Sequence, residues 1–384
     1  MELELSPDQE LFQETTRKFL GSASPVTAVR ALRHDARGFD AGSWRQGAEL
    51  GWTSLLVPEE EGGGSVSGRG LVDLTLVAHE FGRHAAPGPL LPANVVAAAL
   101  GRSGSAGQRA DALPGLLAGE TVAAWAHAEP APNARLGAVS LEARRDGGDY
   151  VLTGVKAPVE AANAAQLLLV SALEGGRLTQ LLVPTDTAGL RVEPMAGLDL
   201  SRRFARVTFD RARVPADAVL GAPGEADEDV ERQLRDGLAI QLAETAGAMD
   251  TAFEMTVEWA FNRYSFGRPL ASYQELKHRF ADMKVWLEAS HAVAGRAARA
   301  VQEDADDAGE WVSVAKSYIG QYGPELAHDC VQLHGGIGVT YDHDLHLFLR
   351  RITVNRQLLG TPHEHRDRLV TIVRSRMQPV GGAR

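Results

Sequence analysis

The sequence predicts an α+β protein in three parts: an N-terminal helical domain over residues 1–119, a middle antiparallel β domain over 120–223 and a C-terminal four-helix-bundle domain over 224–384. Two changes of pattern along the chain carry this prediction. Apolar residues recur at helical spacing in the first third, short apolar runs between Gly-rich turns follow, and long helical stripes then resume. Strands that succeed one another without intervening helices favour an antiparallel sheet.

Composition limits the class of protein. The chain has 384 residues, of which 44% are hydrophobic and 23% are charged, and its formal net charge is −11. An acidic globular chain without a basic block is a poor binder of nucleic acid or anionic lipid. No apolar stretch reaches the roughly 20 residues of a membrane-spanning helix, and the acidic N-terminus does not resemble a signal peptide. We therefore expect a cytoplasmic protein with neither nucleic-acid nor membrane partners. Its one cysteine, Cys330, excludes an intrachain disulfide.

Helix signals dominate the first third of the chain. Ser6 and Gln9 form a capping-box pattern around Pro7, which suits the first turn of a helix. A second helix is expected from Trp44 to Leu50, where Gly51 ends it. Further helices are predicted over 71–81 and 93–100, separated by a proline-rich break.

The middle third reads as strands and the last third as long helices. Strands are predicted over 150–153, 166–170, 180–183 and 206–209. In the last third, apolar residues from Leu276 to Ala298 recur at steps of three and four, and a similar stripe runs from Trp311 to Leu326. Such helices form bundles, and we expect their apolar surface to serve oligomer contacts as well.

Common signatures of nucleotide-binding, hydrolase and metal sites are missing. The chain has no phosphate loop, no strand-linked G-x-G-x-x-G with a following acidic residue and no G-x-S-x-G elbow. His343 and His346 are spaced to touch one metal ion, but no carboxylate-containing metal motif accompanies them. We therefore expect no metal site.

Two stretches carry more information. The first runs from Arg263 through Gly267-Arg268-Pro269 to Met283, and the second is Gln332-Leu333-His334-Gly335-Gly336-Ile337-Gly338-Val339-Thr340. Taken alone, the first is a helix end, a turn and a new helix, and the second is a helix stopped by glycines.

In this order and at this separation the two stretches resemble the acyl-CoA dehydrogenase family. The resemblance spans the chain and includes the segments 124–130, 152–156 and 359–361. The segments 87–92, 344–351 and 360–366 further resemble the bacterial branch that acts on steroid side-chain and similar bulky acyl-CoAs. The resemblance implies an acyl-CoA dehydrogenase-like fold, FAD as cofactor, an acyl-CoA substrate and an electron acceptor such as an electron-transfer flavoprotein.

The resemblance also implies a homo- or hetero-oligomer, a dimer or tetramer, in which each flavin lies between subunits. Arg263 would give charge-assisted hydrogen bonds to phosphate, Ser265 and Gln274 neutral ones, and Phe266 would pack against the ring system. Gln332, Gly335 and Gly336 would allow close backbone approach to the cofactor. Thr361 and His363 match positions beside the ribityl-phosphate side of the flavin.

The catalytic base is where this sequence departs from the family. The reaction needs a carboxylate to remove the α-proton of the substrate. The usual Glu position is Leu359 here, and the position used by a smaller group of members is Gly237. Asp236 is one residue away, about 100° around a helix, and Glu244 is a weaker candidate. The base is therefore unknown, with Asp236 as the weak candidate.

The flavin pocket departs as well. Ala128 and Ala134 stand where the family has hydroxyl side chains. Pro158 stands at the aromatic wall behind the flavin, and Glu160 stands where a small hydroxyl is common. Four interpretations follow: a self-sufficient dehydrogenase with a displaced base, a subunit of a hetero-oligomer whose partner supplies the Glu, a base-free flavin oxidase or monooxygenase relative, and a non-enzymatic helical scaffold. In the second, this chain is a partner subunit that is not catalytic on its own.

Overall fold

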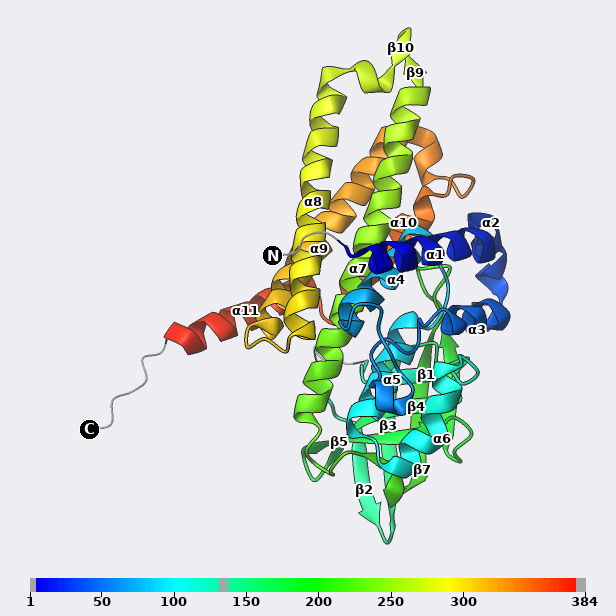
Figure 1. Ribbon diagram of the computed structural model, residues 1–384, viewed down its shortest axis with the longest axis vertical. Helices are drawn as coiled ribbons and strands as arrows, with labels where there is room; N and C mark the ends of the chain where they lie inside the picture. Colours follow the sequence, from blue (N-terminus) through cyan, green and yellow to red (C-terminus); the bar gives the residue numbers. More distant parts are fainter. Residues whose placement is uncertain (1–4, 131–135, 137, 378–384) are drawn as a thin grey trace, which may run out of the picture.

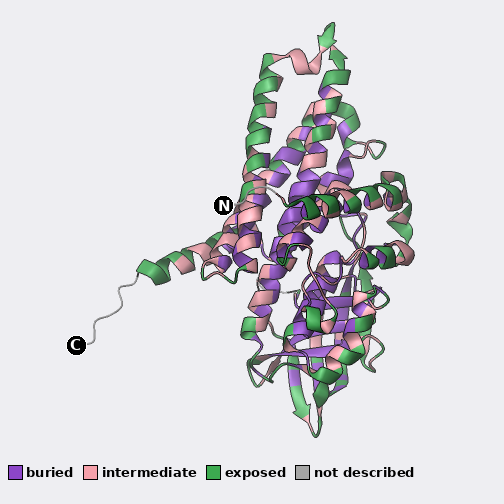
Figure 2. Cartoon of the chain, in the orientation of Figure 1, coloured by how far each residue is buried: buried purple, intermediate pink, exposed green. Residues whose placement is uncertain are grey.

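The computed structural model describes residues 5–130, 136 and 138–377. Figure 1 shows an elongated molecule with the β-sheet at one end and a pair of long helices that extends to the other. The first helices of the chain (blue) lie across the middle, against the helices of the C-terminal third, and the later helices of the N-terminal part (cyan) lie beside the sheet. Buried residues are concentrated in the sheet and in the middle of the long helices, whereas the far tip of the helices is mostly exposed (Figure 2).

The N-terminal helical part contains the helices α1 (Pro7–Ala23), α2 (Val26–Ala31), α3 (Ala41–Glu49), α4 (Gly70–Arg83), α5 (Leu90–Ser103) and α6 (Ala106–Leu117). The capping box expected at Ser6 is present. The backbone N–H of Gln9 donates to the Ser6 hydroxyl, and the backbone N–H of Ser6 donates to the side-chain oxygen of Gln9.

Two glycines allow α4 to cross α7 (Asp227–Asn262) at very short distance. A Cβ atom at Gly82 would lie 1.9 Å from the carbonyl oxygen of Glu244, and one at Gly247 would lie 2.0 Å from that of His79. Because no side chain larger than hydrogen fits there, the two backbones fix the relative positions of the residues beside the crossing.

The middle part forms a sheet of eight strands within the described residues. These are β1 (Ala123–Ala126), β2 (Glu142–Asp146), β3 (Asp149–Glu160), β4 (Leu167–Glu174), β5 (Arg177–Pro184), β6 (Leu190–Met195), β7 (Phe204–Pro215) and β8 (Val219–Leu220). The strand order is β6-β7-β3-β2-β4-β5-β8, with β1 on β4. Most pairs are antiparallel as expected, but β1 and β2 each run parallel to β4. A long connection separates β1 from β4 along the chain, and such connections permit parallel pairing.

The C-terminal part is a bundle of α7, α8 (Gln274–Gln302), α9 (Ala308–His334), α10 (Leu345–Gln357) and α11 (Pro362–Met377). The apolar residues Met283, Leu287, Ala294 and Ala298 of the predicted stripe on α8 are buried, whereas Leu276 and Phe280 remain half-buried where the helix extends beyond the bundle. A short hairpin of β9 (Tyr264–Ser265) and β10 (Arg268–Pro269) connects α7 to α8 at the tip. None of the helices in the described part of the chain is long and apolar enough to cross a membrane.

Candidate active site

A cavity of about 270 Å³ lies where the three parts of the chain meet. The start of α5, strands β1, β3 and β7, the middle of α7 and the segment after α10 all contribute to it. It is lined by Leu91, Pro92, Trp125, His127, Ala128, Pro158, Glu160, Arg202, Phe204, Gln241, Gln357, Leu358 and Leu359. The lining is mainly apolar with a few polar groups, which is typical of cofactor and substrate sites.

Three lining residues carry buried polar atoms without a hydrogen-bond partner in the described structure. These atoms are Nε1 of Trp125, Nε2 of His127 and Nε2 of Gln241. The Trp125 and His127 rings stack with centroids 5.2 Å apart. Buried polar atoms in proteins are normally paired, so an unpaired group beside a cavity indicates a missing ligand or water.

His127 belongs to a buried hydrogen-bond network. The Gln180 amide nitrogen donates to Gln233 at 2.8 Å and to the Ser171 hydroxyl at 3.2 Å. The Ser171 hydroxyl is therefore free to donate to Nδ1 of His127, 3.0 Å away. Burial lowers the pKa of His127 to about 3, and the Lys156 ammonium adds to this effect. The imidazole is thus neutral, and a Ser171 hydroxyl that donates to Nδ1 leaves the ring proton on Nε2.

One acidic side chain, Glu160, lines the cavity among the described residues, and it is bound by a guanidinium. Nε of Arg202 donates to Oε1 of Glu160 at 2.7 Å, and Nη2 donates to Oε2. Nη1 of Arg202 also donates to Glu244 at 3.3 Å and to Asn355. Burial lowers the pKa of Arg202, but the two carboxylates outweigh it and raise that pKa above its usual value. The Glu160 carboxylate is therefore engaged in a buried, forked ion pair.

Leu359 and Gly237, the two positions where the sequence places the family's base, face each other at this cavity. A Cβ atom at Gly237 would lie 3.3 Å from Cδ1 of Leu359 and 3.6 Å from Cζ3 of Trp125. Leu359 has φ +55° and Gly360 has φ +90°, so the segment turns sharply here. A Cβ atom at Gly360 would lie 2.7 Å from Nε2 of His365, which explains the glycine.

The segment that carries Leu359 is anchored by a buried lysine. Nζ of Lys316 donates to the carbonyl oxygens of Asn355 at 2.5 Å and Leu358 at 2.7 Å, and to the Gln241 side chain. Burial lowers the pKa of Lys316 to about 7, and the charge of Arg202 adds to this effect. Sequence reasoning missed both Lys316 and Arg202. The signal for Lys316 is that it is the only charged residue between Trp311 and Gly320.

Asp236 lies away from the cavity. Its carboxylate is buried, with Oδ2 3.0 Å from Nη2 of Arg102 and Oδ1 3.3 Å from Nε of Arg232, and it lines a different, more open hollow. Glu244 accepts hydrogen bonds from Arg351 at 2.6 Å and from Asn355 at 2.8 Å. Both acidic candidates are therefore held in ion pairs, and neither lines the cavity of Leu359 and Gly237.

The residues of the first motif lie at the far tip of the long helices. Arg263, Phe266 and Gln274 are exposed, Phe266 almost completely at 97%, and Ser265 is half-buried. The Arg263 guanidinium lies over the Trp259 ring at 5.7 Å.

The second motif meets the first at this tip. The ring of His334, at the end of α9, stacks on Trp259 with centroids 5.3 Å apart. Gly335 and Gly336 follow His334 directly and are exposed, as is Gln332. The structure therefore brings the two motifs together on one exposed surface, with positive charge and accessible backbone groups.

This tip and the cavity are far apart within one chain. Gln241 lines the cavity and Arg263 follows α7, 22 residues later, which corresponds to about 33 Å along the helix axis. One cofactor molecule that touches both surfaces therefore needs two chains.

Thr361 and His363 lie on the cavity side of the molecule. A Cβ atom at Gly320 of α9 would lie 2.6 Å from Cγ of Pro362, so this segment packs well before Gly335 along that helix. The Thr361 hydroxyl donates to Glu364 at 2.6 Å in the first turn of α11, and His363 is exposed. The structure thus does not bring these two residues to the tip of its own chain.

The residues that depart from the family pattern are placed as follows. Ala128 and Pro158 line the cavity beside Glu160, and none of the three offers a hydroxyl group. Ala134 lies outside the described residues. His343 and His346 do not form a pair: the His343 ring packs 4.5 Å from that of His334, and the His346 ring packs 4.9 Å from that of Tyr341.

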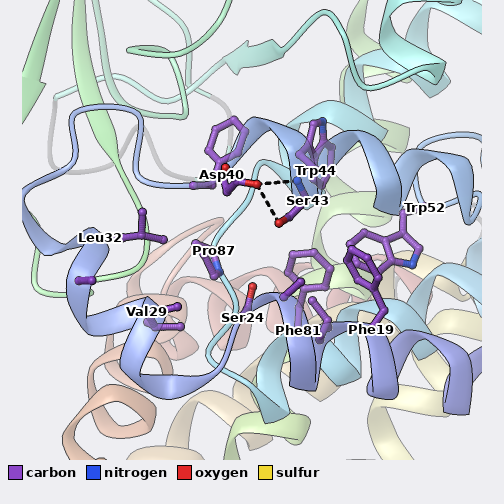
Figure 3. A pocket seen from close by; sticks show the side chains of 15 residues that line it. Phe19, Ser24, Val29, Leu32, Asp40, Ser43, Trp44, Trp52, Phe81 and Pro87 are labelled. Carbon is purple, nitrogen blue, oxygen red and sulfur yellow. Dashed lines mark hydrogen bonds between the residues drawn. The ribbon is translucent and has the colours of Figure 1, made fainter.

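A second hollow of about 240 Å³ lies among α1–α4, and Figure 3 shows the aromatic side chains Phe19, Trp44, Trp52 and Phe81 around it. Its acidic residue, Asp40, accepts from the backbone and the hydroxyl of Ser43 at 2.7 and 2.8 Å. No residue of the predicted site lines this hollow.

Comparisons with known proteins agree with the fold and the sequence motifs. Residues 6–120 match the model of the acyl-CoA dehydrogenase N-terminal domain, and residues 224–373 match that of the C-terminal domain. The chain is 31% identical over 364 residues to the acyl-CoA dehydrogenase IpdE2 of Mycobacterium tuberculosis, covering 94% of this chain and 96% of the relative.

Solved structures give the same result. A variant of the "Tcur3481-Tcur3483 steroid ACAD" is 28% identical with a TM-score of 0.86, covering 96% of this chain and 98% of that one. The butyryl-CoA dehydrogenase of Megasphaera elsdenii shares the fold at 22% identity and a TM-score of 0.87, covering 97% and 100%. The predicted family and fold are thus confirmed, and the relatives are FAD-dependent oxidoreductases. This chain belongs to the acyl-CoA dehydrogenase family.

Proposed function

We propose that this chain takes part in the FAD-dependent α,β-dehydrogenation of an acyl-CoA thioester as one subunit of a hetero-oligomer, whose other subunit supplies the carboxylate base. The observation that carries the proposal is the pair Leu359 and Gly237. Leu359 lines the cavity, Gly237 lies against Leu359 and Trp125 of that lining, and neither position bears a carboxylate. The acid that does line it, Glu160, is held by Arg202. Proton abstraction at the substrate α-carbon therefore needs a carboxylate from elsewhere.

The chain's own residues fit the cofactor. The cavity offers a mostly apolar space with unpaired buried polar nitrogens on Trp125, His127 and Gln241, which suits an aromatic ring system that carries polar atoms. When bound, FAD accepts the hydrogen of the β-carbon as a hydride. The apolar side chains of Leu91, Pro92 and Leu359 exclude water from this space.

The tip completes the flavin site of the partner subunit in this proposal. Arg263 binds pyrophosphate through charge-assisted hydrogen bonds. At the tip, the other contacts to that flavin come from Ser265, Phe266, Gln274, Gln332, Gly335 and Gly336. Thr361 and His363, beside the cavity, contact instead the flavin that binds in this chain's own cavity. The exposure of Phe266 supports this arrangement, because another subunit would cover an apolar side chain that is now fully accessible.

The proposed substrate is a bulky acyl-CoA such as a steroid side-chain thioester, and the proposed electron acceptor is an electron-transfer flavoprotein. Sequence similarity to the steroid enzyme of the "Tcur3481-Tcur3483" structure over nearly the whole chain supports this substrate class.

Co-purification tests the proposal. The chain is produced alone and together with an acyl-CoA dehydrogenase homologue of the same genome that carries Glu at one of the two base positions, and FAD content and mass are measured for both samples. We expect a hetero-oligomer that retains FAD, and we expect Arg263→Ala in this chain to lower the FAD content of that complex. A homo-oligomer of this chain that binds FAD and oxidises acyl-CoA without a partner would overturn the proposal and return the base to this chain.

A further inference from the structure

Three side chains from three helices converge at a place distant from the active site. They are His79 of α4, Asp250 of α7 and His291 of α8. Nε2 of His79 lies 2.7 Å from Oδ2 of Asp250, and Nε2 of His291 lies 2.9 Å from Oδ1. Among the described residues this is the one group of three or more His, Cys, Asp or Glu side chains whose ligand atoms all lie within 4.8 Å of one another.

We propose that His79, Asp250 and His291 bind a divalent transition-metal ion, with zinc as the best match. Two imidazole nitrogens and one carboxylate oxygen are zinc ligands, and magnesium and calcium prefer sites built from oxygen alone. The side chains are 17%, 14% and 35% exposed, so water can reach the fourth position of a tetrahedral site. The proposal is independent of the proposed function.

The backbone holds two of the ligands in place before any ion binds. Gly247 of α7 touches the carbonyl of His79 itself, and Asp250 follows Gly247 by nearly one helical turn. The α4–α7 crossing therefore fixes the separation of the two backbones that carry His79 and Asp250. Rotation of the His79 and Asp250 side chains opens their 2.7 Å nitrogen–oxygen distance to that around a zinc ion, and His291, the most exposed of the three, opens the 2.9 Å one.

The surroundings of His79 suit a metal ligand. When Nε2 binds a metal, the proton of a neutral imidazole sits on Nδ1 and needs an acceptor. Oε1 of Glu80 lies 3.4 Å from that Nδ1, and Glu80 is itself held by Arg17 at 3.0 Å. A carboxylate behind a metal-binding histidine is the usual arrangement that fixes its tautomer.

The charged groups around the three side chains carry a net negative charge when the imidazoles are neutral. Arg83 approaches Asp250 at 3.8 Å, but its guanidinium is forked onto Glu254 at 3.0 and 2.7 Å. With neutral imidazoles, the carboxylates of Asp250, Glu80 and Glu254 outnumber the guanidiniums of Arg17 and Arg83. Zinc is therefore one way to compensate this charge, and protonation of the imidazoles is the competing way.

Metal binding is measured on the full chain in its purified, FAD-containing form. After treatment with a chelator and desalting, the protein is equilibrated with equimolar zinc and desalted again, and its zinc content is determined. We expect about one zinc per chain. We expect cobalt to give the visible absorption of a four- or five-coordinate site. Zinc should raise the thermal midpoint.

Matched variants make the test specific. His291→Gln keeps a donor for Asp250, Asp250→Asn keeps the shape of the carboxylate, and both should weaken zinc binding by at least about tenfold. His328→Gln, an exposed histidine on α9, should bind zinc as the unmodified chain does. The proposal is overturned if the unmodified chain retains no zinc. It is equally overturned if His291→Gln and Asp250→Asn, folded as shown by their thermal midpoints in chelator, retain zinc like the control.

Discussion

Asp236→Asn separates a structural carboxylate from a catalytic one. Asp236 is 1% exposed, and its carboxylate lies between the guanidiniums of Arg102 and Arg232, at 3.0 and 3.3 Å. Its neighbour Gly237 faces the cavity, and successive helical residues point about 100° apart, so Asp236 points away from the cavity. The substitution keeps the shape and removes the charge. Because both guanidiniums are partly exposed, we expect a loss of about 1–3 kcal/mol in the free energy of unfolding.

The assay compares stability with turnover. Urea unfolding gives the free energy, and acyl-CoA-dependent bleaching of the flavin absorbance, in the complex with the partner subunit, gives the turnover. We expect Asp236→Asn to be destabilised and to turn over within about twofold of the unmodified complex, since the positioned base lies elsewhere. Arg102→Gln, which breaks the same ion pair from the other side, is the matched control and should behave alike.

A different outcome would refute this reasoning. If Asp236→Asn lowers turnover by about 10²–10⁴-fold while Arg102→Gln does not, Asp236 is the base. The ion pair would then open in the working enzyme, and the chain would be catalytic by itself.

Three further predictions test the remaining parts of the account. Arg263→Ala should lower FAD retention by about tenfold or more, because it loses a contact worth about 1.5–3 kcal/mol. Arg268→Ala should change FAD retention little, because the Arg268 guanidinium lies over the Tyr273 ring at 3.8 Å. Equal FAD per chain in both variants after gel filtration would refute the phosphate role of Arg263. Burial lowers the pKa of His365 to about 4. The unfolded chain therefore binds more protons between the ordinary His pKa and pH 4, so stability is lost as the pH falls through this window, by up to about 1.4 kcal/mol per pH unit. His365→Gln should flatten that dependence in urea titrations at several pH values, and an unchanged slope would contradict it. Lys156→Met should lower the free energy of unfolding by about 3–5 kcal/mol, because it removes the buried ammonium that lies 2.7 Å from the Glu129 carboxylate. A loss below about 1 kcal/mol would show that the Lys156–Glu129 ion pair contributes little to stability.

Local signals in the sequence were sufficient for the order of elements. Ser6 and Gln9 cap the first helix as their types and spacing require, because capping depends on residues three apart. The strand runs were recognisable because each is short and bounded by turn residues. The parallel pairing of β1 and β2 with β4 was not, because strand pairing depends on contacts between distant segments.

The active site could be predicted only where a motif carried it. The motif around Arg263 and the Gly335 pair are contiguous in the sequence, so a resemblance could point to them. The contacts at the cavity have no such contiguous motif. Arg202 binds Glu160 and Lys316 binds Leu358, and the two residues of each pair are 42 positions apart in the sequence. The convergence of His79, Asp250 and His291 also joins three helices and has no local signature. Such contacts depend on how distant elements pack together. The periodicity of apolar residues predicts the elements themselves but not which of their side chains meet.

The central claim is that this chain has no catalytic base of its own. It is tested most directly by anaerobic titration of the isolated FAD-loaded chain, and of its complex with the partner, with a series of acyl-CoA thioesters from short chains to steroid side chains. The account predicts that the flavin absorbance of the isolated chain remains unchanged while that of the complex is bleached by at least one thioester. Stoichiometric bleaching of the isolated chain by any of these thioesters would contradict it.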